Sequence, residues 1–374
     1  MVINIFREEL FPFEKKMKKK LLYSLLFFCC LSFRISGQEI PVNRFYFNHY
    51  GLEQGLSQSS VLCILQDQTG FMWFGTKDGL NRFDGISFKI FSRDGRDNSI
   101  GNNVINSLCE GGNGDIWIGT DDGVFIYHPL NEKFSRFELK ASDNMMISGP
   151  VLQISQYDKN IWFATESEGF FSYNSISQKL IHYPLKIEGE TASNIVNSFC
   201  IDKENIIWFG VRSKGLFYAD LNFNKIHPFI SVKNRNEFEN DIIFKIVADD
   251  YNSLLIGSAL SGFNRIDLVK HNIEKILPPD NRTFFVRNIL KLSPNEYWIA
   301  SENGIYIYYS DSKKFVHLLH DPDNPYSISD NAIYAIFPDR EGGLWIGSYF
   351  GGIDYLLPKY AHFEKFFPKL KDNS

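Results

Sequence analysis

Residues 67–85 read DQTGFMWFGTKDGLNRFDG, and the WFGT at their centre recurs along the chain. Every tryptophan begins a copy, in which Phe or Ile comes next, then Gly or Ala, then a small residue. The copies begin at Trp73, Trp117, Trp162, Trp208, Trp298 and Trp345, and a seventh copy, LIGS, begins at Leu255. The seven anchors are 44, 45, 46, 47, 43 and 47 residues apart, which is the period of a four-stranded propeller blade.

Each repeat has the same pattern around its anchor. An apolar segment such as VLCILQD from Val61 precedes the anchor and suits an innermost strand that is buried on both faces. A glycine such as Gly79 follows the anchor and favours a hairpin turn, because glycine adopts positive φ without strain. Two further strands complete the unit. We therefore predict an all-β protein, a seven-bladed β-propeller of four-stranded antiparallel blades.

The anchor has a packing role in such a ring. A twisted blade must bury both faces against its neighbours, and an indole in the second strand fills the wedge between blades. The following glycine lets strands approach closely. We assign the propeller to residues 38–357, with a strand at 45–50 that closes the last blade. Residues 358–374 resemble the beginning of another blade, and we interpret them as the start of a truncated second propeller.

The N-terminal region has the pattern of an export signal. Lys18 to Lys20 precede an apolar run of 13 residues, LLYSLLFFCCLSF, and small polar residues follow. We therefore predict a signal peptide at 17–37 and a periplasmic location, and we interpret residues 1–16 as an over-long gene start. The alternative is an uncleaved membrane anchor, although a span needs about 20 apolar residues.

Composition and motifs narrow the function. The formal net charge is −5, and no basic run occurs outside the N-terminus, so a nucleic-acid partner is not expected. Cys109 and Cys200 each lie eight residues before a Trp, which indicates core positions rather than a disulfide. No phosphate loop, nucleophile elbow or metal-binding spacing occurs, so no catalytic residue, metal or cofactor is predicted.

Recurring polar residues have structural explanations. Aspartates follow the inner strand once per repeat, which spreads them around the ring and favours turn formation. They are Asp67, Asp202, Asp249 and Asp339. Six histidines fall in or beside outer strands, and we interpret them as surface or edge residues. They are His128, His182, His227, His271, His317 and His362.

Three segments resemble a known family. HYGLEQGLSQSSV from His49, DQTGFMWFGTKDGLNRFDG from Asp67 and DREGGLWIGSYFGGIDYL from Asp339 are similar to the two-component regulator propeller repeats of hybrid two-component sensors from Bacteroidetes. The resemblance covers residues 43–374. It implies a sensor with two periplasmic propellers, a β-sandwich, a membrane helix, a histidine kinase, a receiver and a DNA-binding domain, which responds to polysaccharide breakdown products. This chain would supply only the first propeller, so the kinase and DNA-binding activities do not transfer to it.

The loops on one face of the ring are candidates for ligand binding. They combine charged and aromatic residues, which suits a sugar or an anionic oligosaccharide. The candidates are Lys77, Asp78, Asp121, Asp122, Glu166, Glu168, Arg212, Lys214, Glu302, Asn303, Tyr349 and Phe350. The alternative is that they are solvated turn residues. Asn106, Asn197 and Arg287 share one column of the inner strand, where they either line the central channel or bond to neighbouring blades.

The leading hypothesis is a non-catalytic sensory propeller. Its partners would be an oligosaccharide, a second propeller or a second copy of the chain, with membrane attachment only through missing C-terminal segments. The alternative is a propeller polysaccharide lyase or glycosidase, which needs convergent carboxylates at the channel mouth. A quinoprotein-like propeller would need a longer docking motif and cofactor ligands, which the sequence does not show.

Overall fold

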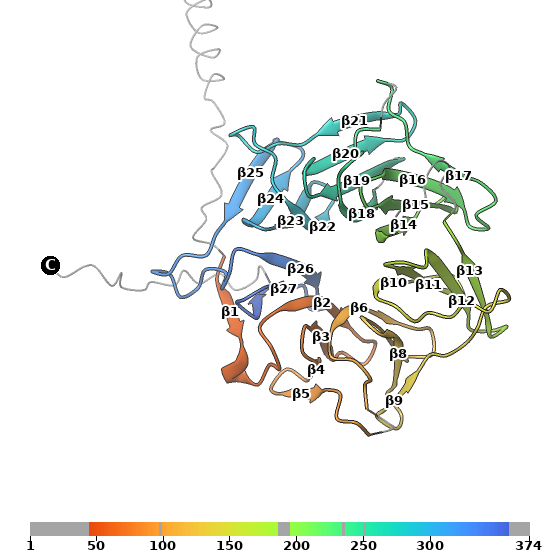
Figure 1. Ribbon diagram of the computed structural model, residues 1–374. Coiled ribbons are helices and arrows are strands. Elements are labelled where there is room, and N and C mark those ends of the chain that lie inside the picture. The colour runs from red at the N-terminus through yellow and green to blue at the C-terminus, as the bar shows by residue number, and fades with distance from the viewer. Residues whose placement is uncertain (1–44, 97–98, 186–194, 234–235, 250–251, 359–374) are drawn as a thin grey trace, which may run out of the picture. The chain divides into compact units, whose positions relative to one another are not determined.

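A computed structural model describes residues 45–96, 99–185, 195–233, 236–249 and 252–358. Within them the chain forms seven four-stranded antiparallel sheets around a central axis (Figure 1). The predicted fold class is therefore confirmed. Some predictions lie outside the described residues. They are those for residues 1–16, for 17–37 and for almost all of 358–374, which includes His362. No helix of the described part is long and apolar enough to cross a membrane.

The blades are numbered in chain order, and their strands run from the axis outward. The inner strands are β2 (Val61–Gln66), β6 (Ile105–Glu110), β10 (Val151–Tyr157), β14 (Val196–Ile201), β18 (Ile243–Asp249), β22 (Val286–Ser293) and β26 (Ile333–Pro338). The anchor strands are β3 (Met72–Thr76), β7 (Ile116–Thr120), β11 (Asn160–Thr165), β15 (Ile206–Val211), β19 (Ser253–Ser258), β23 (Glu296–Ser301) and β27 (Leu344–Ser348).

The third strands are β4 (Leu80–Phe83), β8 (Gly123–His128), β12 (Phe170–Asn174), β16 (Gly215–Asp220), β20 (Phe263–Asp267), β24 (Gly304–Tyr309) and β28 (Ile353–Leu356). The outer strands of blades one to six are β5 (Phe88–Phe91), β9 (Lys133–Arg136), β13 (Lys179–Tyr183), β17 (Ile226–Pro228), β21 (Asn272–Lys275) and β25 (Lys314–Leu318). A 3-10 turn, η2 (Leu52–Gln54), is the only helical element of the described residues.

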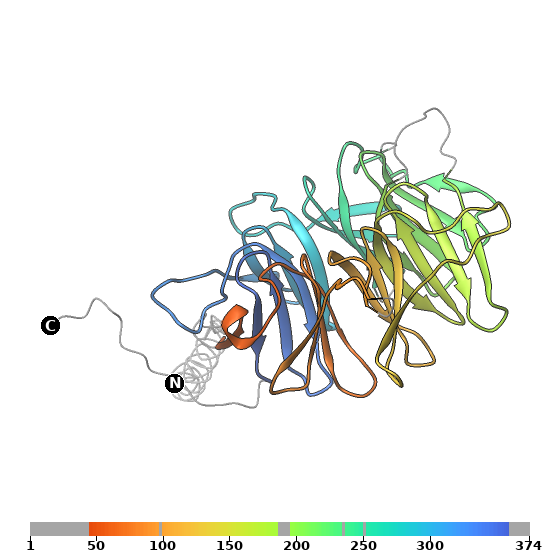
Figure 2. The same ribbon diagram turned by 60° about the horizontal axis from the view of Figure 1, so that its bottom comes forward.

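The outer strand of the seventh blade comes from the beginning of the propeller. Strand β1 (Phe47–Tyr50) pairs antiparallel with β28, and Phe47 lies opposite Leu356. The sheet order is β1-β28-β27-β26, so one sheet joins segments about 300 residues apart (Figures 1 and 2). Hydrogen bonds along this pair close the ring.

Every anchor is buried and packs toward the next blade. The six indoles and the Leu255 side chain are at most 7% exposed. The ring centroids of Trp73 and Tyr127 of the next blade are 5.0 Å apart, and Trp345 of the last blade lies 5.4 Å from Phe74 of the first. These edge-on and tilted contacts are the favourable geometries of aromatic pairs. The anchors therefore join neighbouring blades, as the wedge argument requires.

The third residue of the motif lets consecutive blades approach. A Cβ placed on Gly75 would lie 2.6 Å from the Ile105 side chain of the next blade, and one on Gly257 would lie 2.4 Å from Val286. Real Cβ atoms do not tolerate such distances, so glycine sets the blade spacing at these positions. Two blades carry alanine here instead, Ala164 and Ala300, and both are fully buried.

The fourth residue of the motif closes the hairpin. Its hydroxyl donates to the carbonyl of the turn glycine, at 2.8 Å from Thr76 to Gly79 and 2.9 Å from Thr120 to Gly123. The pattern recurs at Thr165, Ser258, Ser301 and Ser348. All seven hairpin glycines have positive φ, as predicted: Gly79, Gly123, Gly169, Gly215, Gly262, Gly304 and Gly352.

Three of the recurring aspartates form turns and also bond to the anchor. One oxygen of Asp67 accepts from the backbone N–H of Thr69 and of Phe71, which confirms its turn role. The other oxygen accepts from the Trp73 indole N–H at 2.7 Å. Asp202 and Asp339 bond to their tryptophans in the same way, at 2.7 and 2.9 Å. The indole donor is thus satisfied inside the wedge.

The fifth blade has no indole, and its aspartate has different partners. Asp249, whose side chain is 1% exposed, lies 3.0 Å from Arg265 Nη2 and 2.5 Å from Lys291 Nζ of the next blade. A buried carboxylate without a partner is strongly destabilising, and here Arg265 and Lys291 compensate the negative charge of Asp249. The loss of the Trp is therefore accompanied by a buried ion cluster.

The three cysteines of the described region are free, so Cys109 and Cys200 form no disulfide with each other, as predicted. Burial raises the pKa of the Cys109 thiol to about 11 and that of Cys200 to about 12. Such thiols stay protonated and unreactive at neutral pH.

The hydrogen bond between aspartate and indole can be measured with paired variants. Trp73→Phe removes a donor to a buried carboxylate, whereas Trp117→Phe removes an indole N–H that has no acceptor among the described residues. We expect Trp73→Phe to lower the unfolding free energy by about 1–3 kcal/mol more than Trp117→Phe does. Urea unfolding checks this, and equal losses would contradict the assigned role of Asp67.

A histidine is held at the ring closure. His49 Nδ1 lies 2.7 Å from Asp354 Oδ1, and its Nε2 lies 2.9 Å from the Pro325 carbonyl. Both partners accept hydrogen bonds, so both ring nitrogens donate and the imidazolium is favoured. The hydrogen bond to Asp354 is the main cause that raises the pKa of His49 above its usual 6.5.

Ring closure should therefore depend on pH. Because the folded-state pKa of His49 is raised, its contribution is complete below pH 6.5 and is lost as the pH rises through the folded value. We expect the difference in Tm between the wild-type protein and His49→Gln to shrink between pH 5.5 and pH 8. Differential scanning calorimetry across this range measures it. A difference that does not change with pH would show that His49 binds in its neutral form.

Candidate ligand site at the channel mouth

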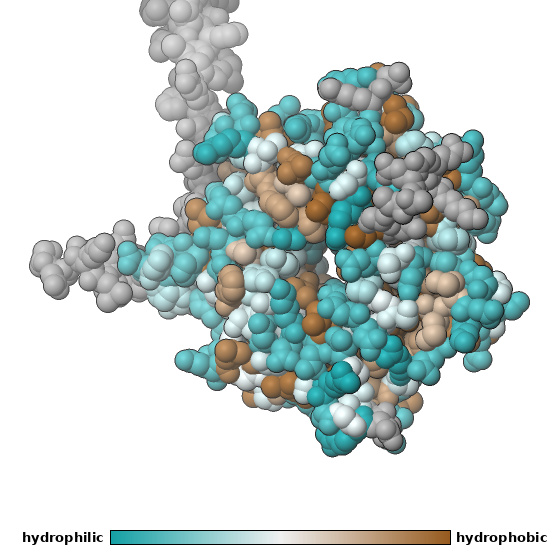
Figure 3. Space-filling model, viewed as in Figure 1, coloured by the Kyte–Doolittle hydropathy of each residue, from teal (hydrophilic) through white to brown (hydrophobic). Residues whose placement is uncertain are grey.

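The inner strand of every blade carries a β-bulge next to the anchor hairpin. The register shifts after the first strand residue in all seven, for example between Val61 and Cys63. Bulges re-aim side chains and commonly lie beside functional sites. The bulged residues, one per blade, are Leu62, Asn106, Leu152, Asn197, Phe244, Arg287 and Tyr334. They surround the axis at one end of the inner strands, where we define the channel mouth, and Figure 3 shows an opening at the centre of the ring.

On one side of the mouth, a cation lies among aromatic rings. The Arg287 guanidinium carbon is 4.5 Å from the ring centroid of Phe244, 4.4 Å from that of Phe285 and 4.5 Å from that of Tyr334. The bulged residues of blades five, six and seven therefore meet at one point. Cation–π contacts of this kind are worth about 0.5–2 kcal/mol each, and more when they are desolvated.

The aromatic surface continues to the first blade. Tyr349 packs on Tyr334 with centroids 5.2 Å apart, and Phe350 packs edge-on against Tyr349 at 4.5 Å. Lys77 Nζ lies 4.2 Å from the Tyr349 ring centroid and donates to its hydroxyl at 2.6 Å. We call Phe244, Phe285, Tyr334, Tyr349 and Phe350 the aromatic arc.

The charges of the arc are paired. Arg287 Nε donates to Glu302 Oε1 at 2.6 Å, and the two side chains are 21% and 35% exposed. Burial raises the pKa of the Tyr334 phenol, and Arg287 offsets part of that rise. The arc therefore presents flat rings with a cation and a carboxylate already held in position.

The other side of the mouth is polar and has no such stack. Asn106 donates to Asp121 at 2.8 Å. Arg212 lies 3.7 Å from Glu166, and its Nε donates to Asn197 at 3.4 Å. The mouth is therefore asymmetric, with aromatic rings over blades five to seven and amide and charged groups over blades two to four.

The structure separates the candidate residues into three sets. Lys77, Glu302, Tyr349 and Phe350 meet on or beside the aromatic arc, whereas Asp121, Glu166 and Arg212 lie on the polar side. In the third set, side-chain bonds join Asp78 to Asn103, Asp122 to Arg136 and Glu168 to Ser148. The backbone groups of Lys214 and Asn303 bond to Asn236 and to Ser301 and His317.

Sequence reasoning missed three rings of the arc. Phe244, Phe285 and Tyr334 read as ordinary apolar residues of inner strands. The available signal was the column of Asn106, Asn197 and Arg287, because Phe244 and Tyr334 occupy the same position in their repeats. The edge histidines mostly stack on neighbouring rings, and His182, although on an outer strand, has a side chain only 7% exposed.

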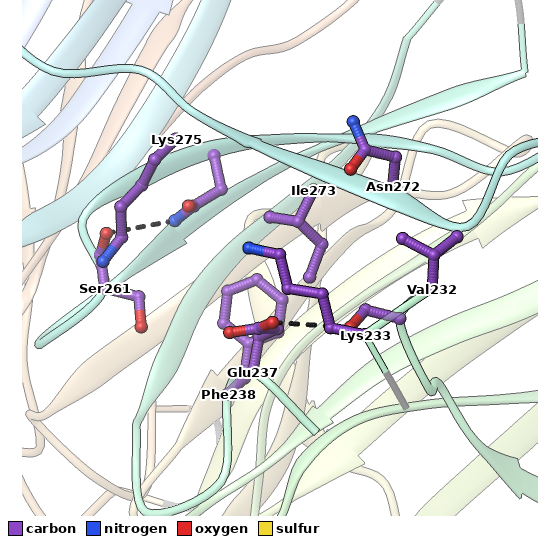
Figure 4. Close-up of a pocket in the computed structure, with 10 residues that line it drawn as sticks. Val232, Lys233, Glu237, Phe238, Ser261, Asn272, Ile273 and Lys275 are labelled. Carbon is purple, nitrogen blue, oxygen red and sulfur yellow. Dashed lines mark hydrogen bonds between the residues drawn. The ribbon is translucent and has the colours of Figure 1, made fainter. Parts of the chain in front are cut away.

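A separate cavity of about 210 Å³ lies between the outer parts of blades four and five (Figure 4). Lys233, Glu237 and Lys275 line it, and Asn264 donates to the Ser261 carbonyl at its edge. Its lining combines cations with a carboxylate and has no aromatic surface apart from Phe238. No group of His, Cys, Asp and Glu in the described residues could hold a metal ion.

These features define a closed seven-bladed propeller with an aromatic and charged surface at one end of its axis. Residues 55–78, 99–122 and 327–350 match the family model described as Two component regulator propeller. Each match runs from the loop before an inner strand into the anchor hairpin. Three of the seven repeats, those of blades one, two and seven, therefore match this family, and the resemblance found in the sequence is confirmed there.

Relatives agree with this result. Histidine kinase P4 of Formosa agariphila is 28% identical, with 88% of this chain and 38% of that protein covered. The extracellular domain of a hybrid two-component system from B. thetaiotaomicron is 26% identical, with a TM-score of 0.73 and coverage of 83% of this chain and 42% of that one. A second such domain from that organism, at 22% identity and a TM-score of 0.70, shows the fold alone. The chain spans about two fifths of the length of these relatives.

The mouth should tolerate changes that a folding core would not. Phe350 is 74% exposed, so Phe350→Ser removes an aromatic ring of the mouth without opening a cavity. We expect its unfolding free energy to stay within about 0.5 kcal/mol of the wild-type value. Urea unfolding is the measurement, and a larger loss would mean that Phe350 is a structural residue.

Proposed function

We propose that this chain is the ligand-recognising propeller of a hybrid two-component sensor, that it is exported to the periplasm, and that it binds an oligosaccharide without reacting with it. The observation that carries the proposal is the aromatic arc at the mouth of a propeller similar to extracellular sensor domains. Kinase and DNA-binding activities belong to other parts of such sensors. A second propeller or a second copy of the chain is the proposed protein partner.

The arc suits a sugar for physical reasons. Sugar rings present C–H faces that pack on aromatic rings, and their hydroxyls need donors and acceptors at fixed positions. Phe350 supplies exposed ring surface and Tyr349 partly exposed ring surface, and Arg287, Glu302 and Lys77 supply polar groups at its edge. The Arg287 pair with Glu302 fixes both groups before binding, which lowers the entropy lost on association.

Catalysis by the mouth is disfavoured by the state of its carboxylates. Glycoside hydrolysis needs one carboxyl group as a general acid and a second as a nucleophile or base. Glu302 is bonded to Arg287, Glu166 faces Arg212, and Asp121 accepts from Asn106. These carboxylates belong to blades six, three and two, and each is held by a partner on its own blade or the next one, so they do not form a free pair. We therefore propose recognition and not a lyase or a glycosidase.

Binding can be tested with paired arginine variants. Arg287→Ala removes the cation of the arc, whereas Arg82→Ala removes an arginine with a similar stacked and paired environment away from the mouth, over Phe71 and beside Glu132. We expect a screen of oligosaccharides to yield ligands that raise the Tm of the wild-type protein, because they bind only the folded state. Arg287→Ala should lose most of that shift, and Arg82→Ala should keep it.

Two outcomes would contradict the proposal. Equal thermal shifts for both variants would place binding elsewhere on the ring. Release of shorter or unsaturated products from a bound oligosaccharide, followed by chromatography, would establish an enzyme instead.

A further inference from the structure

A second candidate site lies on the side of the ring, between blades three and four. A groove of about 670 Å³ is bordered by one face of the outer three strands of blade three and by turns of blade four. We call it the inter-blade groove. Its lining residues used below are Trp162, Ser172, Lys179, Tyr183, Glu204 and Asn222. None of them belongs to the channel mouth.

The groove has a specific cause in the repeat. In blade three the residue directly across from the anchor Trp162 on the third strand is Ser172. The other five tryptophans face a large side chain at that position, namely Arg82, Ile126, Tyr218, Ile307 or Tyr355. The small side chain of Ser172 leaves room for the groove beside the indole, which itself stays covered at 1% exposed.

An unsatisfied donor lies in the same place. Trp162 is 1% exposed, and its indole N–H has no acceptor among the described residues. Three other anchors bond to an aspartate six residues earlier, but blade three has Gln156 there. A buried N–H without an acceptor costs about 1–3 kcal/mol, and because this nitrogen is covered, it reports on the groove through packing and not through direct contact with a ligand.

The rest of the lining offers both ring surface and polar groups. Tyr183 stacks on Trp162 with centroids 5.5 Å apart and planes within 18°, and its hydroxyl lies 3.2 Å from Ser172 Oγ. Lys179, Glu204 and the Asn222 side-chain amide line the groove without a side-chain partner among the described residues. Donors and acceptors are thus available around an apolar floor.

We propose that the inter-blade groove binds a neutral, polyhydroxylated ring, that is, an uncharged sugar unit, independently of the channel mouth. The half-buried Tyr183 packs on the face of the sugar ring, and the Asn222 amide with Lys179 and Glu204 binds the sugar hydroxyls. Lys179 is opposed by Glu204 and Asp220, so the lining has no excess of positive charge that would favour an anion.

The six indole N–H signals in a ¹H–¹⁵N spectrum provide the test, with Trp162 assigned from Trp162→Phe. The probes are cellotriose, xylotriose and laminaritriose at about 10 mM, where even millimolar affinities are detected. We expect at least one probe to shift the Trp162 signal and to leave the signal of Trp117, which also lacks an acceptor, in place. Trigalacturonate, an anionic probe, should shift it less.

Three variants keep the test decisive. Ser172→Tyr introduces the side chain that blades four and seven carry at this position, and it should abolish the shift while the protein stays folded. Asn222→Ala changes an exposed residue and should weaken binding by about two- to tenfold. Arg287→Ala should leave the Trp162 shift intact, so failure at the mouth and failure at the groove are distinguishable. The proposal is overturned if no neutral probe shifts Trp162, or if Ser172→Tyr folds and still shows the shift.

Discussion

The contact between one blade and the next is the constraint on which the rest of this structure depends. A single twisted four-stranded sheet has two apolar faces and cannot bury both alone. Here the anchor glycine lets the next inner strand approach, as at Gly75 and Ile105, and the indole fills the wider outer part of the wedge. Each blade is stable only between two neighbours, so the ring must close, and β1 on β28 closes it.

Closure by a strand from the other end of the propeller also leaves the inner strands free to vary. Away from the mouth, each inner strand has to fit the wedge between two blades. At the mouth end, the bulge turns one residue per blade toward the axis. Seven positions on one rigid scaffold can therefore change without loss of the fold. In this chain three of them, Phe244, Arg287 and Tyr334, converge on one side and create the aromatic arc.

The fold was predictable because its signal is repeated seven times. Three features of the sequence indicate the same unit and agree with one another. They are the spacing of the tryptophans, the apolar inner strands and the hairpin glycines. The site was only partly predictable. A bulge interrupts the two-residue alternation of a strand, so the sequence pattern around Tyr334 predicts a buried side chain. The hydrogen bond between Trp73 and Asp67 spans six residues across a turn, and no periodicity in the sequence marks it. The meeting of Lys77 with Tyr349 depends on closure between the first and last blades.

The departures from the repeat carry as much information as the repeat itself. A closed ring can accommodate a change in one wedge, because the contacts of the neighbouring wedges still fix the blade. Blade five replaces its indole with an ion cluster at Asp249 and keeps its wedge filled. Blade three keeps Trp162, which is 1% exposed, but among the described residues it lacks an acceptor for the indole N–H and has the small Ser172 across from the indole. Trp117 also lacks an acceptor there, so blade three is distinguished by the polar groove beside its indole and not by the missing hydrogen bond alone.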